Sequence, residues 1–387
     1  MKKRNAGSLL PGVLFFLSLF YAPLVEQVKA AANPAAKAKS VVANPAWEAD
    51  WKKTLEAAKK EGKVYIYTVV SSETRGALTN AFTPKYGIQL AFITGRGDDL
   101  VAKLTAERRA NIYMADFFIG GATTPTTTFK PRGFLAPLKP LLILPEVTDP
   151  KAWYGGALFF TDKERQYVPC PVLTAANSYL AVNTDLVKPG EIKTYKDLLN
   201  PKWHGKIIMN DPTIPGAGSR WFAVVADRYT GLDYMRELVK QEPTITRDQR
   251  LQVEGMARGK YPIAIGAQPD ILADFIKAGA HVDTVIPEEG TWLGGGPGLI
   301  VFFDHAPNPN AAKIFANWFL SKEGQTVYSK TARAESARLD VPTDHLDKGD
   351  LRMPGVKYFI SEDEEFLIKK TEYEKKWAKD IFGSLIK

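Results

Sequence analysis

The chain has 387 residues, of which 45% are hydrophobic and 24% are charged, and its formal net charge is +8 at pH 7. This composition is typical of a globular protein and excludes a disordered or collagen-like chain. The basic residues are spread without dense blocks, so we do not expect a nucleic acid partner. The single cysteine, Cys170, excludes an intramolecular disulfide.

The N-terminus has the order of features found in secretory signal peptides. A positive segment (Lys2–Arg4) precedes an apolar stretch (Leu9–Leu24), and Val28–Ala30 has the small-x-small pattern of a cleavage site. We therefore predict a signal peptide over residues 1–30 and a periplasmic mature protein; an uncleaved membrane anchor is the alternative. Residues 31–46 are rich in Ala, Asn, Pro and Lys without apolar periodicity, which predicts a flexible leader.

The folded region is predicted to open with a helix, a strand and a second helix. Apolar residues recur at helical spacing between Trp47 and Lys60, and Val64–Tyr67 has the pattern of a buried strand. Ser71 and Ser72 follow this strand directly and precede the next apolar helical pattern. One of them is expected to cap that helix, and either can also contact a ligand at the carboxyl end of the strand.

The next segments continue the alternation of strands and helices, which predicts a parallel sheet. Gln89–Ile93 has the pattern of a strand, and we expect Asp98 or Asp99 to cap the helix that follows. Ala115–Gly121 is predicted as a further strand that ends in a glycine turn. Small residues at such a turn let a ligand approach the backbone closely, which makes three consecutive residues candidates for ligand binding: Gly121, Ala122 and Thr123.

Three stretches carry a resemblance to a known family: Trp51–Tyr67 (WKKTLEAAKKEGKVYIY), Asp197–Pro212 (DLLNPKWHGKIIMNDP) and Asn308–Gln325 (NPNAAKIFANWFLSKEGQ). They resemble signature stretches of the family 1 extracellular solute-binding proteins, in their ferric-iron-binding-like branch. The resemblance implies a type II periplasmic binding protein fold of the α/β class. In this fold two α/β lobes are joined by two crossing strands and close around a ligand in the cleft between them.

The crossing strands set the expected lobe boundaries. We place the first crossing at Ser178–Asn183 and the return at Leu299–Phe303, which follows the glycine-rich stretch Gly294–Gly298. Lobe 1 is then predicted to span residues 47–177 and 291–387, and lobe 2 residues 178–290. The glycines are interpreted either as a hinge that absorbs backbone rotation or as a turn that allows a close approach of two segments.

A run of small residues in the second lobe has the form of an anion-binding turn. It follows a predicted strand and precedes a predicted helix, so its backbone N–H groups would face an anion, with an arginine adding a bidentate contact. In the resembled iron-binding proteins the matching turn contacts the anion that accompanies the metal. The alternative is that the glycines only shape the loop and the arginine faces solvent. The candidate residues are Gly216, Ala217, Gly218, Ser219 and Arg220.

The second lobe departs from the ferric branch at one informative point. After Tyr261–Gly266 the resembled proteins carry adjacent tyrosines that bind the metal, but this chain has Ala267, Gln268 and Pro269. Ferric iron needs anionic oxygen donors, and a neutral glutamine with a proline cannot replace two phenolates. We therefore expect neither a metal nor a cofactor, and an organic or oxyanionic ligand that Gln268 contacts as a hydrogen-bonding group.

Three other residues near these segments have alternative roles. Trp292 is interpreted as a wall on which a ligand ring stacks or as a core residue. Asp116 and Asp270 are the remaining candidates for metal donors, although Asp270 is expected to cap the helix after it.

Sequence patterns for common enzyme chemistry are missing. The four histidines are isolated from one another, and no G-x-S-x-G or P-loop motif occurs. Cys170 stands between two prolines and is expected to be a small buried residue. We therefore predict a non-enzymatic, monomeric solute-binding component of an ABC transporter, with a small-molecule ligand and the transporter permease as partners. The alternatives are a ferric iron carrier with non-tyrosine ligands, a periplasmic α/β enzyme that uses the same cleft, and a sensor subunit.

Overall fold

The structure is a computed structural model that describes residues 45–386. The predicted signal peptide and all but two residues of the predicted leader lie outside the described residues. Pro45 and Ala46 were assigned to the leader but belong to helix α1 (Pro45–Glu61), because proline is well tolerated in the first turn of a helix. Within the described part of the chain, no helix has both the length and the apolar character needed to cross a bilayer.

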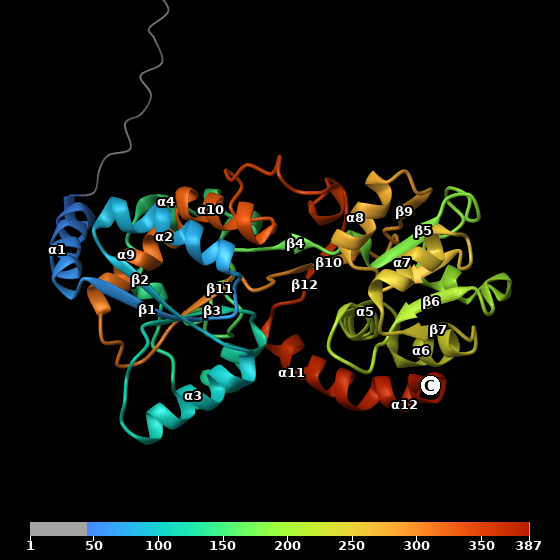
Figure 1. Ribbon diagram of the computed structural model, residues 1–387, viewed down its shortest axis with the longest axis horizontal. Helices are drawn as coiled ribbons and strands as arrows, with labels where there is room; N and C mark the ends of the chain where they lie inside the picture. Colours follow the sequence, from blue (N-terminus) through green and yellow to red (C-terminus); the bar gives the residue numbers. More distant parts are fainter. Residues whose placement is uncertain (1–44, 387) are drawn as a thin grey trace, which may run out of the picture. The chain divides into compact units, whose positions relative to one another are not determined.

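The first sheet has the strand order β11-β3-β1-β2. Strand β1 pairs in parallel with β2 and β3, as the alternation of strands and helices predicted, while β11 runs antiparallel to β3. Helices pack around this sheet, and α1 lies against α9 (Figure 1). The strands are β1 (Lys63–Thr68), β2 (Gln89–Thr94), β3 (Phe117–Gly120) and β11 (Leu299–Phe302), and the helices are α2 (Ser72–Tyr86), α3 (Gly97–Arg109), α4 (Pro145–Thr148), α9 (Pro309–Leu320) and α10 (Lys322–Ala332).

The second sheet has the strand order β7-β6-β8-β5-β9 and is formed by one continuous part of the chain. Strand β6 pairs in parallel with β7 and β8, whereas β5 runs antiparallel to β8 and β9. The strands are β5 (Leu180–Asn183), β6 (Ile207–Asn210), β7 (Thr244–Thr246), β8 (Ile263–Ile265) and β9 (Val282–Thr284), and the helices are α5 (Ala217–Val225), α6 (Gly231–Val239), α7 (Gln249–Ala257) and α8 (Pro269–Lys277).

A third, small sheet connects the other two. Strand β10 (Thr291–Gly294) pairs with β4 (Thr174–Ala175) and with β12 (Tyr358–Ile360). In chain order β4 leads from the first sheet to the second and β10 leads back, so these strands are the crossings. The predicted crossings were wrong in detail, because the strands that were assigned to them, β5 and β11, belong to the second and first sheets. Strand β12 is a further crossing that the sequence did not predict.

The C-terminal helices follow this third crossing. The first of them contributes Leu367 to the core around the first sheet and Phe366 to the core around the second sheet, and the last packs on the second core. They are α11 (Glu364–Glu372), the π-helical turn η10 (Tyr373–Trp377) and α12 (Ala378–Phe382). Phe382 is fully buried, and its ring meets Phe222 edge to face. The predicted boundaries assigned this segment to lobe 1. We propose instead that α12 belongs with lobe 2, because its apolar side chains share a core with α5.

Two predicted helix caps were wrong. Helix α3 begins two or three residues earlier than expected, after Arg96, so Asp98 and Asp99 lie in its first turn, where a carboxylate complements the helix dipole. Helix α8 begins at Pro269 after an N-cap at Gln268, so Asp270 also lies inside the first turn. The predicted cap of α2 is confirmed, because the Ser71 hydroxyl accepts a hydrogen bond from the N–H of Thr74.

Candidate functional site

The first group of candidate residues lies at one edge of the first sheet. Because β1 and β3 are parallel neighbours, with Thr68 opposite Ile119, the residues after both strands lie at the same edge. Ser71 and Ser72 follow β1 and are exposed, and Gly121 follows β3 and is half-buried. The N–H of Thr74 already donates to the Ser71 hydroxyl, so this edge offers the other first-turn N–H groups of α2 beside the two serine hydroxyls.

The two residues after Gly121 contribute differently to this edge. Ala122 is only 3% exposed and belongs to the hydrophobic core around the first sheet. Its methyl group therefore packs into this core and is not available to a solute. Thr123 is half-buried, and its backbone carbonyl accepts a hydrogen bond from the Thr127 hydroxyl at 2.8 Å. The surface that a solute can reach here is therefore formed by the serines, Gly121 and Thr123.

The second group lies at the corresponding edge of the second sheet. Strands β6 and β8 are parallel neighbours, so the turn after β6 and the residues after β8 lie together. The contact is close, because a Cβ atom built on Gly266 would lie 3.0 Å from Cα of Gly218. The structure thus brings Gly216–Arg220 to the same edge as Gln268, which is half-buried at the N-cap of α8.

Three backbone donors of the expected anion-binding turn, those of Gly216, Gly218 and Arg220, have partners within the protein. The N–H of Gly216 donates to the Ser219 hydroxyl at 3.1 Å, and the N–H of Gly218 donates to Oδ1 of Asn210 at 3.0 Å. Ala217 and Gly218 are buried. The turn is therefore a tightly packed helix start, and most of its hydrogen-bonding capacity is used internally.

Arg220 is held by an internal carboxylate. Its guanidinium lies 3.2 Å from Oε1 of Glu362 and donates to the hydroxyl of Ser361 at 3.0 Å. The Glu362 side chain is 3% exposed and that of Arg220 is 24% exposed. Burial is the largest single influence and acts against the charged guanidinium, but Glu362, Tyr179 and Glu374 together outweigh it, so the pKa of Arg220 lies above its ordinary value.

A second pair of charges lies beside this one. Nζ of Lys370 is 3.3 Å from Oε1 of Glu374, and the same carboxylate oxygen lies 3.3 Å from the Ser219 hydroxyl. Burial and the nearby Arg220 lower the pKa of Lys370. The buried cluster at the N-terminus of α5 therefore contains two cationic and two anionic side chains, Arg220, Lys370, Glu362 and Glu374, whose formal charges balance.

Glu362 also connects the two edges. Its Oε1 accepts a hydrogen bond from the N–H of Gly295 at 2.9 Å, in the glycine-rich stretch after β10. A Cβ atom on Gly121 would lie 3.5 Å from the carbonyl oxygen of Gly296, so this stretch also adjoins the first edge. A Cβ atom on Gly295 would lie 2.7 Å from Sγ of Cys170, which is fully buried. These contacts favour the close-approach interpretation of the glycines over the hinge.

Trp292 and Asp116 are structural in this conformation. Trp292 is 2% exposed and its ring meets Tyr179 edge to face, which favours the core alternative. The carboxylate of Asp116 is fully buried and accepts hydrogen bonds from the N–H groups of Tyr65 and Asn308 and from the Asn308 amide. Among the described residues, no cluster of three or more His, Cys, Asp or Glu side chains has the arrangement of a metal site.

Sequence reasoning missed the residues that the C-terminal segment contributes. Glu362, Lys370 and Glu374 come from a stretch in which the sequence patterns predicted no site residue. The signal available was the acidic run Ser361–Glu365, but its partners lie far away in the sequence. Glu364, for example, accepts hydrogen bonds from Nζ of Lys130 at 3.0 and 2.9 Å and from the N–H of Lys163 at 2.8 Å.

The protein has two α/β lobes, each built on one of the two large sheets, and crossing strands join them. This arrangement is a type II periplasmic binding protein fold. The chain belongs to the family of bacterial extracellular solute-binding proteins, whose profile matches residues 77–348. Among curated proteins it is similar to an uncharacterized protein of Haemophilus influenzae, with 26% identity over 342 residues, 84% of this chain and 93% of that protein.

Solved structures show the same fold. The periplasmic binding protein AfuA of Actinobacillus pleuropneumoniae, with fructose-6-phosphate bound, is 23% identical and has a TM-score of 0.53, over 83% of this chain and 98% of that one. An ABC transporter protein of Clostridium perfringens is 18% identical with a TM-score of 0.65, over 82% and 99%. The Trichodesmium protein IdiA (FutA), in complex with iron and citrate, is 20% identical with a TM-score of 0.61, over 84% and 99%.

Proposed function

We propose that this protein is the periplasmic solute-binding component of an ABC importer and carries a small organic solute, without catalysing a reaction. The family and the fold support the transport role. The proposed class of ligand rests mainly on the polar edge of the first sheet. There, exposed serine hydroxyls and first-turn N–H groups of α2 adjoin Gly121 and Thr123. Such neutral donors suit hydroxyl, carboxylate or phosphate oxygens of an organic molecule.

The balanced charges at the second edge refine this proposal. Arg220 already has Glu362 as its counter-ion, so an anionic group of the solute gains little by approaching it. We infer that such a group lies nearer the N-terminus of α2, and that the second edge contributes Gln268 and the surface of the Gly216–Arg220 turn. Ferric iron fits this arrangement less well, because the serine hydroxyls and Gln268 are neutral donors and the carboxylates of Glu362 and Glu374 are already paired with Arg220 and Lys370.

A thermal-shift screen of the chain from Ser40 onward tests the ligand class. The panel contains ferric salts with and without citrate, phosphate, phosphonates, carboxylates, amino acids, polyamines and sugars. A ligand at a hundred times its Kd stabilises a protein by about 2.7 kcal/mol, which raises the Tm by a few degrees. We expect an organic compound to produce this shift. A shift with ferric iron alone would return the protein to the ferric branch.

The site is tested by blocking the first edge. Replacing exposed Ser72 with leucine, S72L, should weaken the ligand found in the screen at least tenfold, because the larger side chain covers the serine edge. T343L introduces the same side chain at another exposed position and should leave affinity unchanged. Isothermal titration measures both variants. Equal affinity of S72L and T343L for the ligand would refute this placement.

A further inference from the structure

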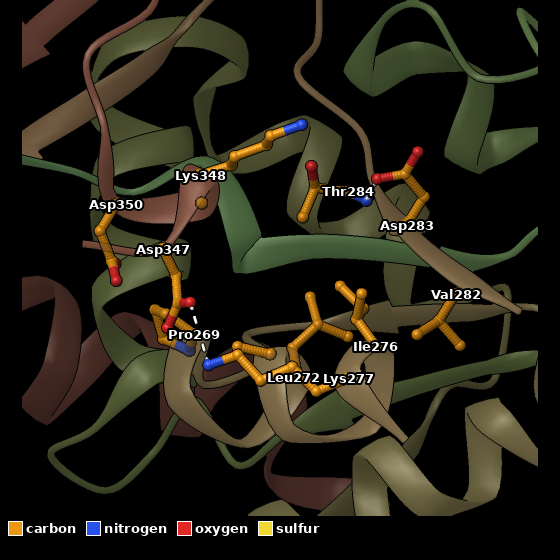
Figure 2. Close-up of a pocket in the computed structure, with 12 residues that line it drawn as sticks. Pro269, Leu272, Ile276, Lys277, Val282, Asp283, Thr284, Asp347, Lys348 and Asp350 are labelled. Atoms are coloured by element: carbon orange, nitrogen blue, oxygen red, sulfur yellow. Dashed lines mark hydrogen bonds and ion pairs between the residues drawn. The ribbon is translucent and has the colours of Figure 1, made fainter. Parts of the chain in front are cut away.

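A cavity of about 420 Å³ lies along helix α8, outside the candidate site. It begins at Pro269 and runs toward the C-terminal end of the helix, between α8, strand β9 and the short 3₁₀ helix η9 (Lys348–Asp350). Figure 2 shows the side chains that line it, with those of α8 and β9 on one side and those of residues 347–350 facing them. It shares no residue with the predicted ligand-binding set.

One wall of this cavity is apolar. Leu272, Ile276 and Val282 contribute aliphatic side chains, and Pro269 and Ala273 extend the same surface. Ile276 is 44% exposed, although it is a large hydrophobic residue. Its exposed methyl groups border the cavity, so an occupant with a hydrocarbon body would remove apolar surface from water.

The opposite wall is acidic, and of its two carboxylates only that of Asp347 has an ion-pair partner among the described residues. Asp347 forms an ion pair with Lys277 at 3.1 Å, marked by the dashed line in Figure 2. No described residue donates a hydrogen bond to the carboxylate of Asp350. Lys348 extends away from Leu272 and Ile276 in the same view. On this wall, Asp350 is therefore the carboxylate that an incoming group can reach without breaking the ion pair of Asp347.

The electrostatic surroundings of Asp350 favour a cation. Burial and the nearby carboxylates Asp347 and Asp270 raise the pKa of Asp350 to about 6. Glu335 acts in the same direction and Arg333 acts against it. The lining also includes Asp283 on β9 and the cations Lys277 and Lys348, of which Lys277 is already paired. An unpaired carboxylate among other carboxylates is stabilised by a positive charge.

We propose that this cavity is a second binding site, which takes a small organic cation with an apolar body, such as a primary amine on a hydrocarbon ring or chain. The ammonium group pairs with the Asp350 carboxylate, and the hydrocarbon packs on Leu272, Ile276 and Val282. The occupant contacts helix α8, which packs beside the second sheet, and residues 347–350, which precede strand β12 in the chain. The proposal is independent of the ligand that the candidate site carries.

Three probes with one ring and different charge test the proposal on the chain from Ser40 onward: benzylamine, benzyl alcohol and benzoate. Isothermal titration at pH 7.5 should show saturable binding of benzylamine at least tenfold tighter than that of the alcohol, and no binding of benzoate. The variant D350N should weaken benzylamine at least fivefold. D344N removes a charge from an exposed side chain outside the cavity and should have no effect.

Two further readouts separate binding in the cavity from general charge effects. Benzylamine affinity should fall as the pH drops through about 6, because Asp350 becomes protonated, and D350N should lose this dependence. I276K places a cation at the exposed side of the cavity and should abolish binding while the protein remains folded. Equal affinities for the three probes, or equal benzylamine affinities in D350N and D344N, would overturn the proposal, as would the absence of saturable binding.

Discussion

Replacing Glu362 with alanine should lower the free energy of unfolding by about 3 kcal/mol, at the lower end of the range for breaking a buried ion pair. The change leaves the Arg220 guanidinium without its counter-ion and the N–H of Gly295 without its acceptor. The lower end of the range applies because Arg220 keeps 24% of its side chain exposed and can be partly hydrated. Urea unfolding followed by tryptophan fluorescence measures the difference.

The matched control for E362A lies three residues further along the same segment. Glu365 is exposed and forms an ion pair with Lys369, four residues along α11, so E365A should leave the unfolding midpoint nearly unchanged. A double variant, R220M with E362L, should recover much of the loss, because it removes both buried charges together. If E362A and E365A unfolded at the same urea concentration, the internal pairing of Arg220 would be disproved.

Replacing Gly218 with alanine should be the most damaging single-methyl substitution at the candidate site. A Cβ atom there would lie 2.1 Å from the backbone oxygen of Asn210 and 2.9 Å from that of Asp211, so strand β6 and helix α5 must move apart. Overpacking against backbone costs about 3 kcal/mol. We expect a drop in Tm of several degrees together with loss of binding of the ligand found in the screen, measured by calorimetry and titration.

Gly216 offers the control for G218A, two residues earlier in the same turn. A Cβ atom on Gly216 would meet only Oδ1 of Asn210, at the ordinary contact distance of 3.5 Å. Its φ of 162° is extended backbone that alanine adopts without strain. G216A should therefore cost less than about 1 kcal/mol, the usual loss when alanine replaces a favourable N-cap residue. Equal Tm values for the two variants would show that β6 and α5 are not in this close contact.

Local sequence patterns predicted much of the fold because the elements concerned carry a strong periodicity. The ends of helix α1 and strand β1 were located to within two residues. The family resemblance added the arrangement of two lobes, which no local pattern determines. The crossings were misplaced because β4 has only two residues, too few to show any periodicity.

The candidate site was less predictable, because its main interactions join distant parts of the chain. Local reasoning correctly placed a turn and a helix start at Gly216–Arg220 but could not show that Asn210 and Glu362 use its donors. Arg220 and Glu362 are 142 residues apart in the sequence. An arginine beside a turn of small residues suggests a site for an anionic ligand. Only the fold reveals that the anion beside Arg220 is the carboxylate of Glu362.

The strand order of the first sheet has a consequence for how the chain folds as it is made. Its edge strand β11 comes from residues 299–302 but pairs with β3, which comes from residues 117–120. The second sheet uses only residues 180–284, so its strands are all present before β11 emerges. A growing chain therefore exposes the open edge of β3 throughout the synthesis of the second sheet, and such an edge pairs readily with other chains. This interval is when the protein most needs protection by chaperones.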